Sequence, residues 1–166
     1  GAAGAVDRLS LEIARSLEDA PTTVCWVFDQ SESLAGQRQE IASRLKRVFR
    51  ELSLNDQGEA PDGLTNLVLA YGQRFQFVVN KPTRISSEVV EAIQGIEIDN
   101  SGVEKTFTAI RAAAERLNAT RRVGRSSGMV VVFTDEVGDD QVLADQVAIS
   151  CRRLGVSVCV VGVPAP

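Results

Sequence analysis

The sequence contains no histidine, and only three of its 166 residues are cysteine. Without histidine the chain cannot form a Ser-His-Asp triad, a Cys-His pair or a zinc site with histidine ligands. The cysteines Cys25, Cys151 and Cys159 form no Cys-x-x-Cys pair, and their odd number indicates no disulfide framework. We expect Cys25 and Cys159 to be small buried residues, with a bridge between them as an open alternative.

Long apolar runs and an excess of basic charge are missing as well. The longest apolar run, Gly128 to Phe133, is far shorter than the roughly 18 residues that a membrane span needs, so we expect no membrane-spanning segment. The 18 Lys and Arg against 22 Asp and Glu give a net charge of −4, which disfavours nucleic acid as a partner. A hydrophobic fraction of 44% is typical of a folded globular chain.

The length fits one folded domain, since domains commonly have roughly 100–200 residues. We expect residues 1–166 to form a single domain in which a helix over 5–19 precedes a core over 22–161. Residues 1–4 and 163–166 are typical of linkers, which indicates a domain excised from a longer protein.

The order of the apolar patterns predicts an α/β fold. Apolar residues at helical spacing predict helices over 5–19, 41–52, 86–93, 106–117 and 142–154. Continuous apolar runs predict strands over 22–28, 64–71, 75–79, 129–134 and 156–161. This alternation predicts a Rossmann-like, doubly wound, mostly parallel central sheet with helices on both faces. The short link 72–74 makes 75–79 the one antiparallel edge strand.

Several local details follow from turn and capping chemistry. Polar and turn-forming residues predict loops over 30–37, 55–63 and 97–103. Ser86 or Ser87 is expected to cap a helix at its start, and Gly155 to end one. The aromatic residues expected in the core are Trp26, Tyr71 and Phe75.

Two of the strands end in aspartate, at Asp29 and Asp135. Open α/β sheets bind ligands at the carboxyl ends of their strands, and a cation relieves the repulsion between two carboxylates there. Ser31 and Ser33 follow Asp29 at alternate positions, which face the same way in an extended loop. A carboxylate with two hydroxyls is an all-oxygen ligand set, which favours Mg²⁺, Mn²⁺ or Ca²⁺.

Three segments together resemble the metal-ion-dependent adhesion site of von Willebrand factor A domains, and we expect a bacterial member of that family with a glutamate at the threonine position of the site. They are Asp29-x-Ser31-x-Ser33, the stretch Gly102 to Ile110, and Phe133-Thr134-Asp135-Glu136. The resemblance implies the fold of that family and a non-enzymatic, adhesion-type module that binds a protein partner through a divalent cation.

The resemblance, which runs from about Thr22 to Val161, also implies residue roles. It implies that Asp29 and Asp135 hold the metal largely through water and that Ser31 and Ser33 bind it directly. The sixth position of the metal is left for an acidic group of the partner.

The second segment departs from the family pattern, which has a metal-binding threonine there. Alignment on Ala109-Ile110 puts Glu104 at that position and Thr106 at the second threonine position, whereas a one-turn shift makes Thr106 the ligand. With Glu104, three carboxylates surround a dication and leave one net negative charge. This arrangement suits Ca²⁺ and weakens the attraction for an acidic partner, whose position Glu104 could itself fill.

The face expected to bind the partner is acidic, so a polar or basic protein fits it best. Its residues are Gln30, Glu32, Val103, Glu136 and Asp139. Asp139 and Asp140 are expected to be acids at the rim of the site or caps of the next helix.

Two other functions stay open. A degenerate, metal-free scaffold is favoured by Glu104. A phosphoryl-transfer enzyme is disfavoured, because Ser31 stands where an Asp-x-Asp motif needs its second acid and no lysine follows Lys105. The compartment is not determined by the sequence, with a weak preference for an extracytoplasmic or membrane-associated parent protein.

Overall fold

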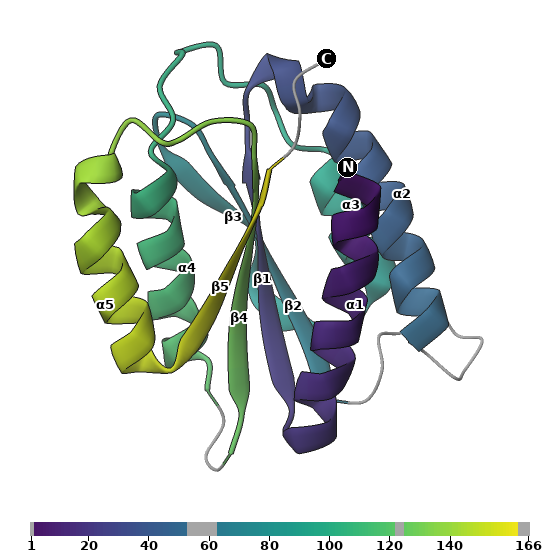
Figure 1. The fold of residues 1–166 in the computed structure, drawn as a ribbon. Coiled ribbons are helices and arrows are strands. Elements are labelled where there is room, and N and C mark those ends of the chain that lie inside the picture. The colour runs from purple at the N-terminus through teal and green to yellow at the C-terminus, as the bar shows by residue number, and fades with distance from the viewer. Residues whose placement is uncertain (1, 53–62, 122–124, 163–166) are drawn as a thin grey trace.

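The computed structural model describes residues 2–52, 63–121 and 125–162. A five-stranded sheet separates α1, α2 and α3 on one face from α4 and α5 on the other (Figure 1). The strands are β1 (Thr22–Asp29), β2 (Leu64–Tyr71), β3 (Phe75–Thr83), β4 (Ser127–Thr134) and β5 (Val156–Gly162). The helices are α1 (Ala2–Asp19), α2 (Ala35–Leu52), α3 (Ser86–Gln94), α4 (Thr106–Ala119) and α5 (Ala144–Leu154).

The strand order is β3-β2-β1-β4-β5, with β3 antiparallel to β2 and the other neighbours parallel. This confirms the predicted mostly parallel sheet with one antiparallel edge strand. Because β1 lies in the middle, its end at Asp29 is in register with Tyr71 of β2, and Phe28 is in register with Phe133 of β4. The strand-end residues that could carry chemistry are therefore brought to one edge.

The central strand β1 is buried on both faces, which explains its continuous apolar sequence. Alternate residues Val24, Trp26 and Phe28 enter the core beneath α1 and α2. Cys25 and Val27 enter the second core, beneath α4 and α5. All five side chains are fully buried, so the position of β1 is set from both sides.

Aromatic rings form a stacked layer just below the carboxyl end of β1. The ring centroids of Phe28 and Phe133 lie 4.9 Å apart, and those of Trp26 and Phe133 lie 6.4 Å apart. Aromatic contacts at such distances add to the free energy gained by burial of the rings. We call this layer the aromatic floor, because it lies beneath the polar residues that follow these two strands.

Several helix boundaries differ from the prediction. Residues 2–4, expected as linker, form the first turn of α1, whereas 163–166 and most of the predicted loop 55–63 lie outside the described residues. The loop predicted over 30–37 is shorter, because a 3₁₀ turn at Glu32–Leu34 leads into α2 at Ala35. The helix predicted over 142–154 begins with a 3₁₀ turn, since Leu143 N–H bonds to the carbonyl of Asp140, three residues back.

Two further local predictions are wrong, and one is confirmed. Neither Ser86 nor Ser87 caps α3; Thr83 Oγ1 instead accepts the N–H of Ile85 and closes the turn before the helix. Phe75 is 45% exposed because it begins the edge strand β3, whereas Trp26 and Tyr71 are fully buried as expected. Gly155 ends α5 in the left-handed conformation, at φ 66°.

The three cysteines are free, and the alternative of a Cys25–Cys159 bridge is wrong. Cys25 belongs to the core on the α4 and α5 side, whereas Cys159 packs against the core on the α1 side, so the sheet separates the two thiols. Cys25 is buried as predicted, and Cys159 is only half-buried. Among the described helices, none combines the length and hydropathy that crossing a bilayer requires.

A buried polar link between β1, β2 and β3 generates the first testable prediction. Trp26 Nε1 donates to Asn66 Oδ1 at 2.9 Å, and Asn66 Nδ2 donates to the carbonyl of Thr83 at 3.2 Å. We expect Asn66→Ala to lower the free energy of unfolding by about 1–3 kcal/mol, because it leaves the buried indole N–H without an acceptor. Urea unfolding measures this, with the exposed Asn80→Ala as control; equal midpoints for the two variants would contradict it.

Candidate metal centre

Three carboxylates from separate parts of the chain meet at the carboxyl edge of the sheet. Asp29 ends β1, Asp135 follows β4, and Glu104 stands two residues before α4. Each offers an oxygen, and these three oxygens lie within 4.8 Å of one another. Asp29 and Glu104 are 1% and 8% exposed, and Asp135 is half-buried. We call these three residues the carboxylate cluster.

Asp29 is held in one orientation by hydrogen bonds to both of its oxygens. Oδ1 accepts the N–H of Ser31 at 2.9 Å and the hydroxyl of Ser31 at 2.6 Å. Oδ2 accepts the hydroxyl of Thr134 at 2.9 Å. Because a buried carboxylate without partners would be very costly, these donors are what permit its burial.

Arg38 of α2 fixes the backbone of the loop that carries the serines. Its Nη1 donates to the carbonyl of Asp29 at 2.9 Å and to that of Ser31 at 3.0 Å. The side chain is 3% exposed; burial lowers the pKa of the guanidinium, and the charge of Asp29 opposes this shift. Sequence reasoning missed Arg38. The available signal was an arginine within the apolar stripe of Leu34, Ile41 and Leu45.

Ser31 bridges two members of the carboxylate cluster. Its Oγ donates to Asp29 Oδ1 and lies 2.5 Å from Glu104 Oε1. A hydroxyl has a single proton, so two ionised carboxylates cannot both be satisfied by it. The second contact needs a proton on Glu104 or a cation nearby. Ser33 is more peripheral and exposed, and its hydroxyl donates to Asp135 Oδ2 at 3.2 Å.

The pKa of Glu104 also indicates that the carboxylate cluster lacks a compensating positive charge. This pKa is raised from 4.5 to about 7: burial is the largest cause, the bond to Ser31 opposes it, and the charges of Asp29, Glu136 and Asp135 add to the rise. Within the described residues, Glu104 Oε2 and Asp135 Oδ1 are buried without a hydrogen-bond partner. Two orphaned acceptors among clustered carboxylates fit a hard dication that prefers oxygen ligands.

The structure separates the two residues that the sequence left as alternative ligands. The carboxylate of Glu104 points into the cluster. The hydroxyl of Thr106 instead donates to the phenol oxygen of Tyr71 at 3.0 Å, and both residues are buried. Gly138 closes over Thr106, since a Cβ at that position would lie 2.6 Å from Thr106 Oγ1. Thr106 therefore pairs with Tyr71, a residue expected only to fill the core.

Asp139 and Asp140 tie the loop after β4 to the start of α4. Asp139 Oδ2 accepts the N–H of Glu104 at 2.6 Å, and Asp139 N–H returns a bond to the carbonyl of Glu104 at 2.8 Å. Asp140 accepts the N–H groups of Phe107 and Thr108, at 3.0 and 2.8 Å. Asp140 stands at the N-cap position of the 3₁₀ turn that leads into α5, as one alternative expected, while its carboxylate caps α4. Asp139, expected at the partner face, positions Glu104.

The other residues predicted to contact a partner surround the carboxylate cluster. Glu32 and Glu136 are exposed, Val103 is half-buried, and Gln30 uses its side chain to donate to the carbonyl of Glu97 at 2.9 Å. Sequence reasoning missed exposed apolar side chains in the flanking loops and 3₁₀ turn. These are Ile98, Val137 and Val142, which are 43%, 69% and 85% exposed.

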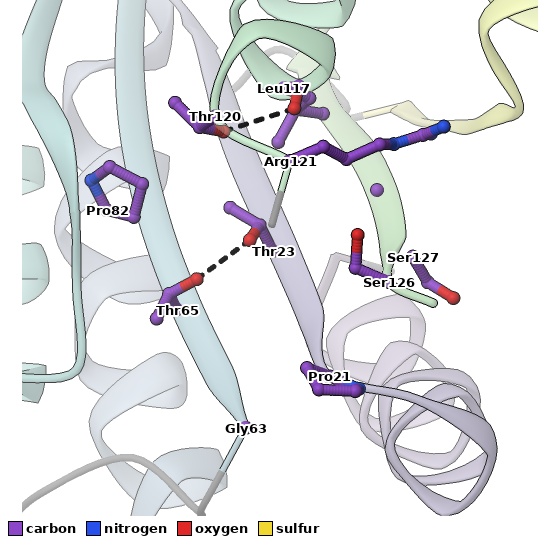
Figure 2. A pocket seen from close by; sticks show the side chains of 11 residues that line it. Pro21, Thr23, Gly63, Thr65, Pro82, Leu117, Thr120, Arg121, Ser126 and Ser127 are labelled. Carbon is purple, nitrogen blue, oxygen red and sulfur yellow. Dashed lines mark hydrogen bonds between the residues drawn. The ribbon is translucent and has the colours of Figure 1, made fainter. Parts of the chain in front are cut away.

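A hollow of about 190 Å³ lies at the other end of the sheet, where β1, β2 and β4 begin (Figure 2). The hydroxyls of Thr23 and Thr65 meet there at 2.8 Å, beside Ser126, Ser127 and Arg121. Among the described residues, no carboxylate lines this hollow. The only acidic ligand set that the described chain brings together is the carboxylate cluster at the opposite edge.

A family model covers most of the chain. The family model described as von Willebrand factor type A domain matches residues 24–165. No curated protein matches the chain.

Solved structures with a similar fold come from several kinds of protein. The vWF domain of the type V pili tip protein Mfa5 from Porphyromonas gingivalis is 20% identical, with a TM-score of 0.55 over 72% of this chain and 39% of that one. Proximal thread matrix protein 1 from the mussel byssus is 17% identical, with a TM-score of 0.66 over 86% and 38%. BatB from Bacteroides thetaiotaomicron is 20% identical, with a TM-score of 0.59 over 85% and 66%. At these identities the likeness shows the fold alone.

The raised pKa of Glu104 generates a prediction about pH in chelator-treated protein. Between pH 4.5 and about 7, the unfolded state ionises this side chain while the folded state keeps it protonated. Its contribution to stability is therefore complete below pH 4.5 and is lost as the pH rises through 7. We expect Glu104→Gln to exceed the parent chain in unfolding free energy at pH 8, by an amount on the order of a few kcal/mol.

The two chains should approach one another in stability near pH 5. Chemical denaturation with urea at both pH values, with the exposed Glu97→Gln as a matched control, measures the difference. A parent chain whose stability advantage over Glu104→Gln grows towards alkaline pH would contradict the assigned shift.

Proposed function

The chain belongs to the von Willebrand factor type A domain family, and we propose that it is a non-enzymatic protein-interaction module organised by a divalent cation. The observation that carries the proposal is the carboxylate cluster, in which two buried oxygens have no partner among the described residues. The donors that would hold the ion are the carboxylates of Asp29, Glu104 and Asp135, with the hydroxyls of Ser31 and Ser33. Bound there, the ion would relieve most of the repulsion between the three carboxylates at the sheet edge.

The donor chemistry favours Ca²⁺ among the candidates Mg²⁺, Mn²⁺ and Ca²⁺. The donors are oxygens only, and Ca²⁺ accepts more carboxylate oxygens and more irregular geometry than Mg²⁺. We assign Thr106 a supporting role, because its hydroxyl is engaged by Tyr71. Glu104 would leave the occupied site with one net negative charge, so an acidic group of a partner would be attracted only weakly.

A partner with polar or basic groups and some apolar surface fits the edge around the cluster. Glu32, Glu136 and Asp139 make this edge acidic, while Gln30 and Val103 lie beside them. The exposed side chains of Ile98, Val137 and Val142 add apolar contact area. The similar structures include a pilus tip protein and an aerotolerance-related membrane protein, which supports a protein partner and an extracytoplasmic or membrane-associated parent protein.

A metal-free scaffold is the second candidate, and one observation favours it. The 2.5 Å contact between Ser31 Oγ and Glu104 Oε1 and the raised Glu104 pKa of about 7 both support a proton on Glu104, which would satisfy part of the cluster. In that case the domain would bind its partner without an ion. No observation favours phosphoryl transfer, since among the described residues the cluster holds no lysine.

Metal binding is tested by calorimetric titration of chelator-treated protein with Ca²⁺, Mg²⁺ and Mn²⁺. An ion bound only by the folded state stabilises it by about 2.7 kcal/mol at a hundredfold excess over Kd. We therefore expect a rise in melting temperature of several degrees, largest with Ca²⁺. Asp29→Ala should abolish both the heat of binding and the thermal shift.

The matched control is Glu97→Gln, an exposed acid near the same edge whose side chain lies outside the cluster. It should bind the ion like the parent chain. If no ion changes the melting temperature of the parent chain, the metal-dependent proposal is wrong and the metal-free scaffold stands.

The role of Glu104 is tested by Glu104→Thr, which restores the residue usual in the family. We expect metal affinity to fall by tenfold or more, because one of three carboxylates is lost. Binding of acetate as a probe of acidic ligands should at the same time become stronger in the presence of the ion, because the site regains positive charge. Equal metal affinity in both chains would show that Glu104 is not a ligand.

A further inference from the structure

Buried charge is concentrated at one place in this molecule. Among the acidic and basic residues that the structure describes, only Asp29, Arg38 and Glu104 are buried, and the others are half-buried or exposed. All three meet at the carboxyl edge of the sheet, where Asp135 completes the carboxylate cluster. A buried charge is costly unless an opposite charge compensates it, so the charges at this edge must nearly balance.

Arg38 supplies the positive charge of this group. Its Nη1 contacts the carbonyl oxygens of Asp29 and Ser31, and the side chains of both residues are among the proposed donors to the ion. These two acceptors are neutral, so neither bond cancels the charge of the guanidinium, which stays protonated in proteins. The side chain is 3% exposed, and salt screens buried charges much less than exposed ones. The charge of Arg38 therefore acts on the carboxylates and on any ion between them.

On the basis of the metal-dependent function proposed above, we propose that Arg38 determines which ionic charge the carboxylate cluster accepts. Three ionised carboxylates and one guanidinium leave two negative charges at this edge, which a divalent cation cancels. A trivalent cation would leave a surplus positive charge beside the guanidinium. Without Arg38 the edge would carry three negative charges, and a trivalent cation would become the better match.

The exposed charges around the cluster affect this balance less. Glu32, Glu136 and Asp139 are exposed, and salt weakens the interactions of exposed charges more than those of buried ones. Arg38 also offsets the negative charge that three carboxylates and a divalent ion alone would leave. Apart from the exposed acids, the occupied edge then carries no net charge.

The test compares the affinities of Ca²⁺ and La³⁺, two cations that prefer oxygen ligands, by calorimetric titration of chelator-treated protein. The Coulomb energy of an ion scales with its charge, so loss of a nearby fixed charge changes the logarithm of the La³⁺ affinity about 1.5 times as much as that of the Ca²⁺ affinity. We expect Arg38→Gln to raise the ratio of La³⁺ to Ca²⁺ affinity by about threefold or more, which corresponds to about a tenfold effect of the charge on Ca²⁺.

The affinity ratio separates the charge of Arg38 from its role in holding the loop. Loss of the two bonds to the carbonyls would lower both affinities together without raising the ratio. Arg38→Lys keeps the charge and should retain the ratio of the parent chain, even where both affinities fall. Arg47→Gln removes an exposed positive charge from the same helix and should leave the ratio unchanged.

A charge cycle keeps the test decisive where Arg38→Gln alone does not fold. Glu104→Gln removes one negative charge and should lower the ratio of La³⁺ to Ca²⁺ affinity. The double variant Arg38→Gln with Glu104→Gln removes one charge of each sign and should return the ratio to that of the parent chain. Circular dichroism of each variant confirms that its fold is retained.

Two kinds of failure are distinguished by whether the parent chain binds Ca²⁺. If it does, equal ratios in the parent chain and Arg38→Gln, or a double variant that keeps the low ratio of Glu104→Gln, would overturn the role of Arg38 and leave the metal centre in place. A parent chain that binds neither ion would overturn the metal centre and the role of Arg38 together.

Discussion

The burial of the Asp29 carboxylate at the end of the central strand is the constraint on which the rest of the site depends. The strand β1 is covered on both faces and ends at Asp29, whose side chain is 1% exposed. Ser31 and Thr134 supply the donors to its oxygens, and Arg38 supplies the nearby positive charge. The loop after β1, the end of β4 and the buried face of α2 are thereby fixed relative to one another.

The same constraint also bears on the segment before α4 and the loop after β4. Asp139 holds both the N–H and the carbonyl of Glu104, whose side chain approaches Asp29. Gly138 has no side chain, which leaves room for Thr106 to reach Tyr71 beneath it. The aromatic floor of Phe28 and Phe133 keeps β1 and β4 together below these contacts. Hydrogen bonds and apolar packing thus bring the carboxylates together at one edge of the sheet. The repulsion between these carboxylates then requires a proton or a cation to relieve it.

The parts of this arrangement that follow from local pattern could be predicted. The apolar runs of β1 and β4, each followed by aspartate, indicate strands that end at a shared edge. The spacing of Ser31 and Ser33 indicated an extended loop, whereas Ser33 lies in a 3₁₀ turn. Contacts between distant segments could not be predicted. Asp140 caps a helix that begins more than thirty residues earlier. Arg38 can be buried because its guanidinium donates to the carbonyls of Asp29 and Ser31. Phe75 is exposed because β3 lies at the edge of the sheet, and that position depends on the strand order.

Helix α4 is fastened at both ends to the part of the chain that follows it. Asp140 holds its first turn, and beyond its last turn Arg121 donates to the carbonyl of Gly155, where α5 ends and β5 begins. Such reciprocal ties make neighbouring elements open together rather than singly. We therefore expect α4, β4, α5 and β5 to behave as one cooperative unit in hydrogen exchange, whose amides lose their protection in a single subglobal opening.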